Sequence, residues 1–147
     1  MVKKLVFSLL AILTCLSIGA WIWTQREVGP GTAPFDGKVW RAARRAQRYG
    51  PRMAMAKSAR NLATTCPNRQ CVEQLFGMPE RTIDEPVSHL EWLGDSKEGY
   101  VGKPPSGRCY VMEYDLEPTT FFTDVAYFLR VYVDKSDAVR GTAISLG

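Results

Sequence analysis

The chain has little of what most catalytic sites require. Histidine occurs only once in 147 residues, at His89. The sequence contains no Gly-x-Ser-x-Gly, no P-loop and no His-Glu-x-x-His motif, so the common hydrolase, nucleotide-binding and zinc-protease sites lack their parts. We therefore expect a protein that works by binding, with no enzymatic activity and no cofactor.

Cysteine is also scarce, with four residues in the whole chain. Cys66 and Cys71 lie five residues apart across a predicted joint between helices, and in an exported domain we expect a disulfide between them. The alternative is a zinc site in which Cys109 and His89 join these two thiolates. Cys109 is otherwise expected to be an unpaired, buried cysteine in a strand, and its pairing with Cys66 or Cys71 stays open.

Acidic residues are few in the first half of the chain. Residues 24–81 hold eleven Lys or Arg against four Asp or Glu, whereas residues 82–147 hold six against eleven, so the domain should be electrically dipolar. A spacing of three and four places a basic stripe on one face of a predicted helix: Arg41, Arg44, Arg45 and Arg48. We interpret the stripe as a solvated surface, with contact to anionic lipid as the alternative. No nucleic-acid motif accompanies it, so nucleic acid is not an expected partner.

An apolar segment lies close to the N-terminus. Lys3 and Lys4 give it a positive start, and residues 5–23 follow with no charged side chain. As a helix these residues would span about 28 Å, close to the bilayer core of about 30 Å. We therefore expect residues 1–24 to be an uncleaved signal anchor, with residues 5–23 in the inner membrane and the C-terminal domain in the periplasm.

Two alternatives to an anchor stay open. The small residues of the tripeptide at 17–19 resemble a signal-peptide cleavage site, and cleavage near Gly19 would release a secreted or periplasmic protein. Cys15 lies in a loose likeness to a bacterial lipobox, which would attach lipid there. Residues 25–37 are rich in glycine and proline and are predicted to be a linker.

Residues 38–147 are predicted to form one domain that begins with helices. A first helix is expected at 38–49, with Trp40 opposite the basic stripe, and a second at 53–63 after the Gly50-Pro51 break. Asn68 is a good N-cap for a short helix that stops at Gly77. The sequence therefore predicts two or three helices.

The second part of the domain alternates with a period of two, which indicates strands. The candidates are 89–93, 109–117, 127–133 and 138–145, and the last two form a hairpin around a polar turn at 134–137. The glycine- and proline-rich loop 94–107 is a candidate binding loop. We thus predict an α+β fold in which the helices pack on one face of a three- or four-stranded antiparallel sheet.

The other face of this sheet is the expected binding surface. Glu113, Asp115 and Glu117 share it by alternation, and we interpret them as solvated carboxylates with no catalytic or metal-binding role. Aromatic and arginine side chains dominate binding energy at protein interfaces. The candidate partner-binding residues are therefore the three of that kind at or beside the loop, Trp92, Tyr100 and Arg108, with a place in the core as the alternative for Trp92.

The segment at 68–79, Asn-Arg-Gln-Cys-Val-Glu-Gln-Leu-Phe-Gly-Met-Pro, resembles the short second helix and the Leu-Leu-Gly-x-Pro-like helix stop of the SmpA/OmlA (BamE-like) domain family. Residues 110–114 and 129–139 look like the second and third strands of that domain. The likeness covers about residues 52–145 and implies an arrangement of two helices followed by three antiparallel strands.

Members of this family are small envelope lipoproteins that support the outer-membrane β-barrel assembly machinery, and similar units occur in a secreted β-lactamase inhibitor. All of them act by binding. The resemblance thus implies a membrane-anchored envelope accessory or scaffold protein that binds another envelope protein. The alternative is a periplasmic inhibitor or immunity-type protein that blocks an enzyme in the same compartment.

Overall fold

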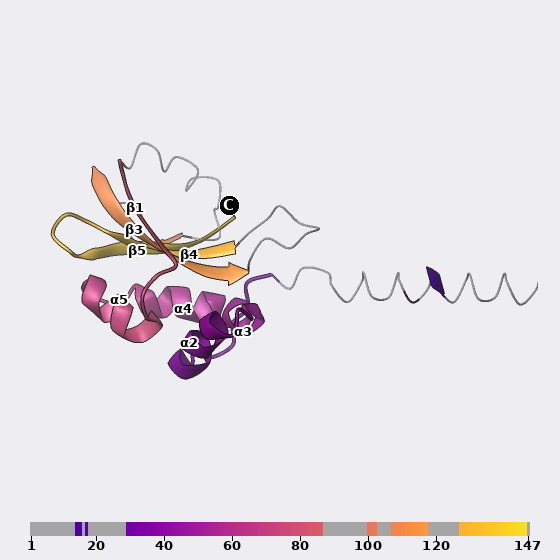
Figure 1. The fold of residues 1–147 in the computed structure, drawn as a ribbon. Helices are drawn as coiled ribbons and strands as arrows, with labels where there is room; N and C mark the ends of the chain where they lie inside the picture. The colour runs from indigo at the N-terminus through magenta and orange to yellow at the C-terminus, as the bar shows by residue number, and fades with distance from the viewer. Residues whose placement is uncertain are drawn as a thin grey trace, which may run out of the picture.

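The computed structural model describes residues 14, 15, 17, 29–86, 100–102, 107–117 and 127–146, which are drawn in colour in Figure 1. Most of the apolar segment 5–23, the predicted strand 89–93 with Trp92, and most of the loop 94–107 lie outside these residues. Among the described residues, no helix combines the length and the apolar character needed to span a membrane.

The described chain is an α+β domain of two layers. Four helices, α2 (Gly37–Arg45), α3 (Gly50–Ala54), α4 (Ala56–Ala63) and α5 (Arg69–Phe76), cover one face of an antiparallel sheet (Figure 1). The sheet contains β1 (Arg81–Pro86), β2 (Tyr100–Gly102), β3 (Arg108–Glu117), β4 (Tyr127–Val133) and β5 (Val139–Leu146) in the order β1-β3-β4-β5-β2. The predicted fold class is confirmed, but the numbers of helices and strands were both too low.

Local sequence signals explain where the helices begin and end. Asp36 caps α2 by accepting from the amides of Lys38 and Val39. This helix stops at Arg45, short of the predicted end at residue 49, because Gln47 adopts a positive φ of 50° that a helix cannot continue through. The predicted helix 53–63 starts earlier, with Pro51 in the first turn, and is interrupted at Met55 to give α3 and α4.

The short helix α5 was predicted correctly. Asn68 accepts from the amide of Cys71 as its N-cap, and Gly77, at a φ of 83°, ends the helix. The β4–β5 hairpin and β3 also agree with the sequence pattern. The two strands that were missed are the edges of the sheet: β1 has only one large apolar residue, Ile83, and β2 has three residues within the predicted loop.

The core lies between the two layers and contains the alternate residues of β3 that were expected there. Met112, Tyr114 and Leu116 are buried against the helices. Trp40 of α2, Phe76 of α5 and Tyr114 of β3 meet ring to ring, with centroids 5.4 to 6.4 Å apart. These aromatic contacts bury apolar area where three elements converge.

Residues 31–36, which the sequence assigns to the linker, lie against the helices. The amide of Gly31 donates to the carbonyl oxygen of Met53, and the carbonyl oxygen of Gly31 accepts from the amide of Lys57. A Cβ atom at Gly31 would lie 2.4 Å from the carbonyl oxygen of Ala54, so only glycine permits this approach. The chain therefore enters the domain within the helix layer.

The face of the sheet opposite the helices is not the solvated carboxylate surface that the sequence predicts. Glu113 is only 1% exposed. It lies opposite Arg130 of β4 and opposite Arg81 of β1 in the strand register, and its two carboxylate oxygens lie 2.6 Å and 3.4 Å from their Nε atoms. The prediction failed because both ion-pair partners come from other strands. Asp115 is half-buried, and the side chain of Glu117 lies outside the description.

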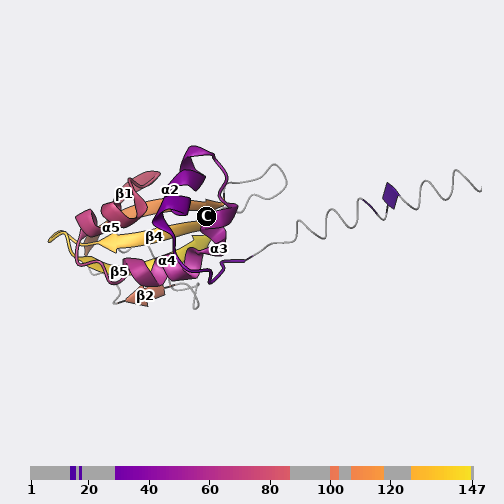
Figure 2. The ribbon, with the colours of Figure 1, turned by 90° about the horizontal axis from the view of Figure 1, so that it is seen from below.

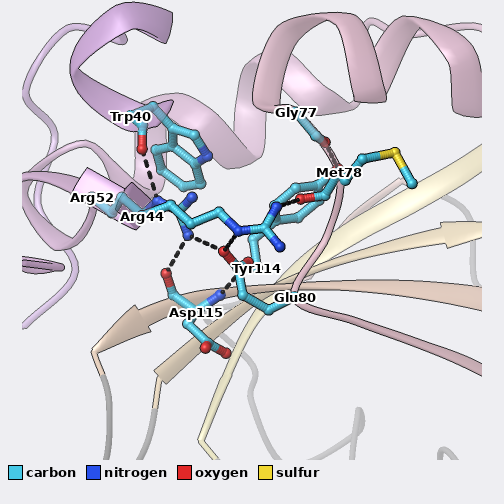
Figure 3. Close-up of polar contacts among 8 residues, drawn as sticks. All are labelled: Trp40, Arg44, Arg52, Gly77, Met78, Glu80, Tyr114 and Asp115. Carbon is cyan, nitrogen blue, oxygen red and sulfur yellow. Dashed lines mark hydrogen bonds and ion pairs between the residues drawn. The ribbon is translucent and has the colours of Figure 1, made fainter. Parts of the chain in front are cut away.

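A buried arginine joins the two layers (Figure 3). The side chain of Arg52 in α3 is fully buried, and its Nε donates to the carbonyl oxygen of Trp40 at 3.0 Å. Its Nη1 donates to Glu80 Oε1 and to the carbonyl oxygen of Asp115, both at 3.0 Å. The guanidinium carbon also lies 4.8 Å from the centre of the Trp40 ring. Arg52 thus connects α2, the residue before β1, and β3.

Glu80 completes this connection. Its Oε2 accepts from the amide of Asp115 at 3.2 Å, and its Oε1 also lies 3.2 Å from Nε of Arg44 (Figure 3). Burial, followed by the nearby charge of Glu80, raises the pKa of Asp115 above its usual range. We name the group Arg52, Glu80, Arg44 and Asp115 the interlayer cluster.

Glu80→Gln should destabilise the domain by about 3 kcal/mol, because it leaves the charge of Arg52 buried without its carboxylate. The double variant Arg52→Met with Glu80→Gln should cost less than Glu80→Gln alone. Chemical denaturation of the purified chain measures both. Glu73→Gln is the matched control, since it breaks a partly exposed pair with Arg69 and should cost below about 1 kcal/mol. Equal losses for the two Glu→Gln variants would contradict this role for the interlayer cluster.

Candidate functional site

A charged groove lies where the β4–β5 turn meets the start of β3, at one end of the sheet. One part of the groove has a volume of about 260 Å³, and it adjoins a second part of about 370 Å³. Both parts share Arg108, Asp134 and Lys135. We name this feature the turn groove. Its further lining includes Arg69, Asp84, Tyr110 and Asp137.

Asp134 holds the β4–β5 turn in shape. Its Oδ1 accepts from the amide of Ser136 at 2.8 Å, from the Ser136 hydroxyl at 2.6 Å and from the amide of Ala138 at 3.0 Å. Its Oδ2 accepts from Arg140. These hydrogen bonds, above all that from the Ser136 side chain, lower the pKa of Asp134 to about 2. The carboxylate therefore stays ionised at neutral pH. Its hydrogen bonds fix the backbone of the β4–β5 turn, which forms one wall of the groove.

The disulfide predicted from the sequence forms one support of the groove. Cys66 and Cys71 are joined across the connection from α4 to α5, with their Cα atoms 5.5 Å apart. Between them, Asn68 forms a β-bridge with Ala138, and the carbonyl oxygen of Pro67 accepts from the amide of Val139 at 3.2 Å. The bond therefore closes the short loop whose residues 67 and 68 contact the hairpin, and it uses two of the three thiols that the zinc alternative required.

Arg69 and Arg108 contribute the two guanidinium groups of the groove. Arg69, in the first turn of α5, lies with its Cζ atom 4.6 Å from the centre of the Tyr110 ring, and its Nε donates to Glu73. Arg108 is 53% exposed and donates through Nε to Asp84 Oδ1 at 2.7 Å. Both arginines are thus oriented by neighbours while Arg108 stays open to a partner.

Lys135 and Asp137 are the exposed charges at the tip of the groove. Within the described part of the chain, neither takes part in an ion pair that would neutralise it. A lysine, an arginine and a carboxylate along one groove suit recognition of a polar protein segment, because complementary charges fix the register of a partner. The groove therefore offers specificity by charge.

The structure separates the residues that the sequence had grouped as a binding site. Arg108 lines the turn groove, and by strand alternation it shares the face of Tyr110. Tyr100 lies in β2 on the opposite face, where its ring centre is 5.8 Å from that of Tyr132. Burial raises the pKa of Tyr100 to about 12, with a further contribution from Cys109. Trp92 lies outside the described residues.

Sequence reasoning missed the part of the groove that comes from the hairpin. Asp134 was read as a turn residue, and its spacing to Ser136 is a common turn signal, but nothing local indicated that the turn would meet Arg69 and Arg108. Cys109 is buried as expected, and burial raises the pKa of its thiol, so it stays protonated at neutral pH. Cys109 is therefore a packing residue.

The chain matches no protein-family model, no curated protein and no solved structure.

Replacement of both disulfide cysteines, Cys66→Ser with Cys71→Ser, should lower the free energy of unfolding by about 2 kcal/mol, because a five-residue loop is no longer closed in the unfolded chain. Denaturant titration of the oxidised chain measures this loss. Cys15→Ser is the control, since Cys15 is a free, exposed cysteine whose replacement should leave the stability unchanged. Identical curves for the double variant and the parent chain would refute the stabilising role.

Proposed function

We propose that this chain is a membrane-anchored accessory or scaffold protein of the cell envelope, which binds another envelope protein through the turn groove. In this proposal residues 5–23 hold the chain in the inner membrane and the domain lies in the periplasm. The domain acts by binding, without catalysis.

The observation that carries the proposal is that a disulfide supports the groove. Disulfides persist in oxidising compartments and are rare in the cytosol. The Cys66–Cys71 bond fixes residues 67 and 68, which contact the start of β5, and it precedes Arg69 in the groove wall. The disulfide would form once the domain is exported to an oxidising compartment, and the binding surface would then be complete. Export agrees with Lys3 and Lys4 and with the uncharged segment 5–23 of the sequence.

Arg108 is the residue that we propose as the main contact for the partner. Arginine is enriched among the residues that dominate interface energies, and its forked guanidinium suits carboxylates and carbonyl groups. Its bond to the exposed Asp84 is a surface pair of small energy, so a partner group can replace it at little cost. Tyr100 and Trp92 remain candidates for a separate contact.

The resemblance of residues 52–145 to the SmpA/OmlA domain also supports the proposal, because that family acts by binding in the envelope. The inhibitor or immunity-type alternative would use the same groove. The two differ in the partner, which would be a membrane-complex component in the first case and a soluble enzyme or toxin in the second.

The proposal can be tested by placing a photo-crosslinking amino acid at position 135 of the full chain in cells. We expect a crosslinked partner that is lost when Arg108→Gln is added, because the groove then lacks its main guanidinium. The crosslinked product is identified by mass spectrometry after solubilisation of the envelope.

The matched control places the same crosslinker at position 57, in the helix layer, with Arg48→Gln as the equivalent loss of one exposed charge. That position should give no partner that depends on Arg108. Two results would show that the turn groove is not the binding surface. One is a partner that crosslinks at position 135 equally well with and without Arg108→Gln. The other is a partner that crosslinks only at position 57 and does not depend on Arg108.

A further inference from the structure

The helix layer carries positive charge almost without acids. Residues 37–72, which include α2, α3, α4 and the start of α5, contain nine Lys or Arg and no Asp or Glu. Figure 2 views the domain from the side of this layer. The acids of the described chain lie mainly on the sheet and in its turns, so the charge separation of the sequence follows the two layers of the fold.

Some of these nine charges are already neutralised inside the domain. Arg44 and Arg52 pair with Glu80, and Arg69 pairs with Glu73. Four others are exposed side chains for which the described chain supplies no ion pair: Lys38, Arg45, Arg48 and Lys57. These four form the cationic surface of the layer.

Large exposed apolar side chains occur in the same layer. Among the described residues they are Val39, 42% exposed in α2, and Met78, 58% exposed just after α5. The two segments are in contact, because Arg44 of α2 donates to the carbonyl oxygen of Met78 (Figure 3). Basic residues beside exposed apolar residues are typical of surfaces that bind the interface of a membrane.

The chain enters the domain on this side. Gly31 is hydrogen-bonded to Met53 of α3 and to Lys57 of α4. Residues 24–30 separate it from the apolar segment 5–23. Seven residues span at most about 25 Å when fully extended, so an anchored chain would keep the helix layer close to the bilayer.

We propose that the cationic surface of the helix layer docks on anionic phospholipid headgroups of the membrane that holds the apolar segment. The face of the sheet opposite the helices then faces away from the bilayer, and the turn groove lies at the end of the sheet beside α5. The inference rests on the proposed function for the anchor alone, and it concerns a surface that the turn groove does not include.

Amine acetylation of the full chain in lipid nanodiscs tests the docking. Lys38 and Lys57 report on the helix layer, and Lys135 in the β4–β5 turn is an internal control. In discs with about 30 mol% phosphatidylglycerol, the acetylation of Lys38 and Lys57 should slow about threefold or more relative to discs of phosphatidylcholine alone. Lys135 should react at the same rate in both, and about 0.5 M salt should abolish the difference. Phosphatidylserine should act like phosphatidylglycerol, since the contact is one of charge.

Two charge-matched variants make the test specific. The double variant Arg45→Gln with Arg48→Gln should remove most of the protection of Lys38 and Lys57. The double variant Lys135→Gln with Arg140→Gln removes the same charge from the β4–β5 hairpin and should leave that protection intact. Equal acetylation in neutral and anionic discs would overturn the proposal. The proposal would also be overturned if the protection of Lys38 and Lys57 did not depend on lipid charge or salt but increased with the number of chains per disc. That result would indicate contact between copies of the chain.

A chain that does not integrate into the discs would speak against the anchor of the proposed function. The docking can then be decided by sedimentation of the same chain with vesicles of the same two compositions. Salt-sensitive binding to the anionic vesicles that Arg45→Gln with Arg48→Gln weakens about tenfold would support the docking surface. Absence of binding would overturn it.

Discussion

The buried guanidinium of Arg52 determines how the helix layer meets the sheet. Removing such a charge from water is costly, and the cost is offset only where the geometry supplies an opposite charge and hydrogen-bond acceptors. Here Glu80 supplies the charge, two backbone carbonyl groups supply acceptors and the Trp40 ring covers one side. Because these groups come from α2, from the residue before β1 and from β3, a shift of any one of these segments would leave the charge uncompensated.

This constraint also explains the separation of charge across the domain. Glu80 neutralises two arginines of the helix layer at its inner side, and four other cations of that layer are exposed at its surface, Lys38, Arg45, Arg48 and Lys57. On the sheet, Glu113 is neutralised in turn by Arg81 and Arg130. The buried ion pairs therefore leave one cationic outer surface on the helices and a groove of mixed charge at the β4–β5 turn. The two proposals, docking on lipid and binding of a partner, use these two surfaces.

Local patterns were sufficient to predict the central elements. Asn68 and Gly77 mark the ends of α5, the alternation of β3 and β4 indicates their buried faces, and the spacing of Cys66 and Cys71 indicated the disulfide. Each of these signals acts within a few residues. The edge strands β1 and β2 could not be found in this way, since they are stabilised by pairing with β3 and β5 and have little apolar pattern of their own.

The binding site was predicted less well, for a related reason. Arg108 lies in the groove, but Asp134 and Arg69 reach it from distant parts of the chain. Glu113 looked solvated because its partners Arg81 and Arg130 become its neighbours only through strand register. The burial of Arg52 was equally hidden, since in the sequence it is one of several arginines near a basic stripe. The sequence pattern alone thus did not reveal the ion pairs between residues that lie far apart in the chain.

Native-state hydrogen exchange tests most directly whether Arg52 makes one cooperative unit of the two layers. The amide of Ala59 in α4 and the amide of Leu129 in β4 should open with the same free energy, equal to that of global unfolding, because the helices cannot leave the sheet without exposing the interlayer cluster. Exchange of Ala59 with an opening free energy about 2 kcal/mol or more below that of Leu129 would show that the helix layer detaches by itself, and would contradict the account.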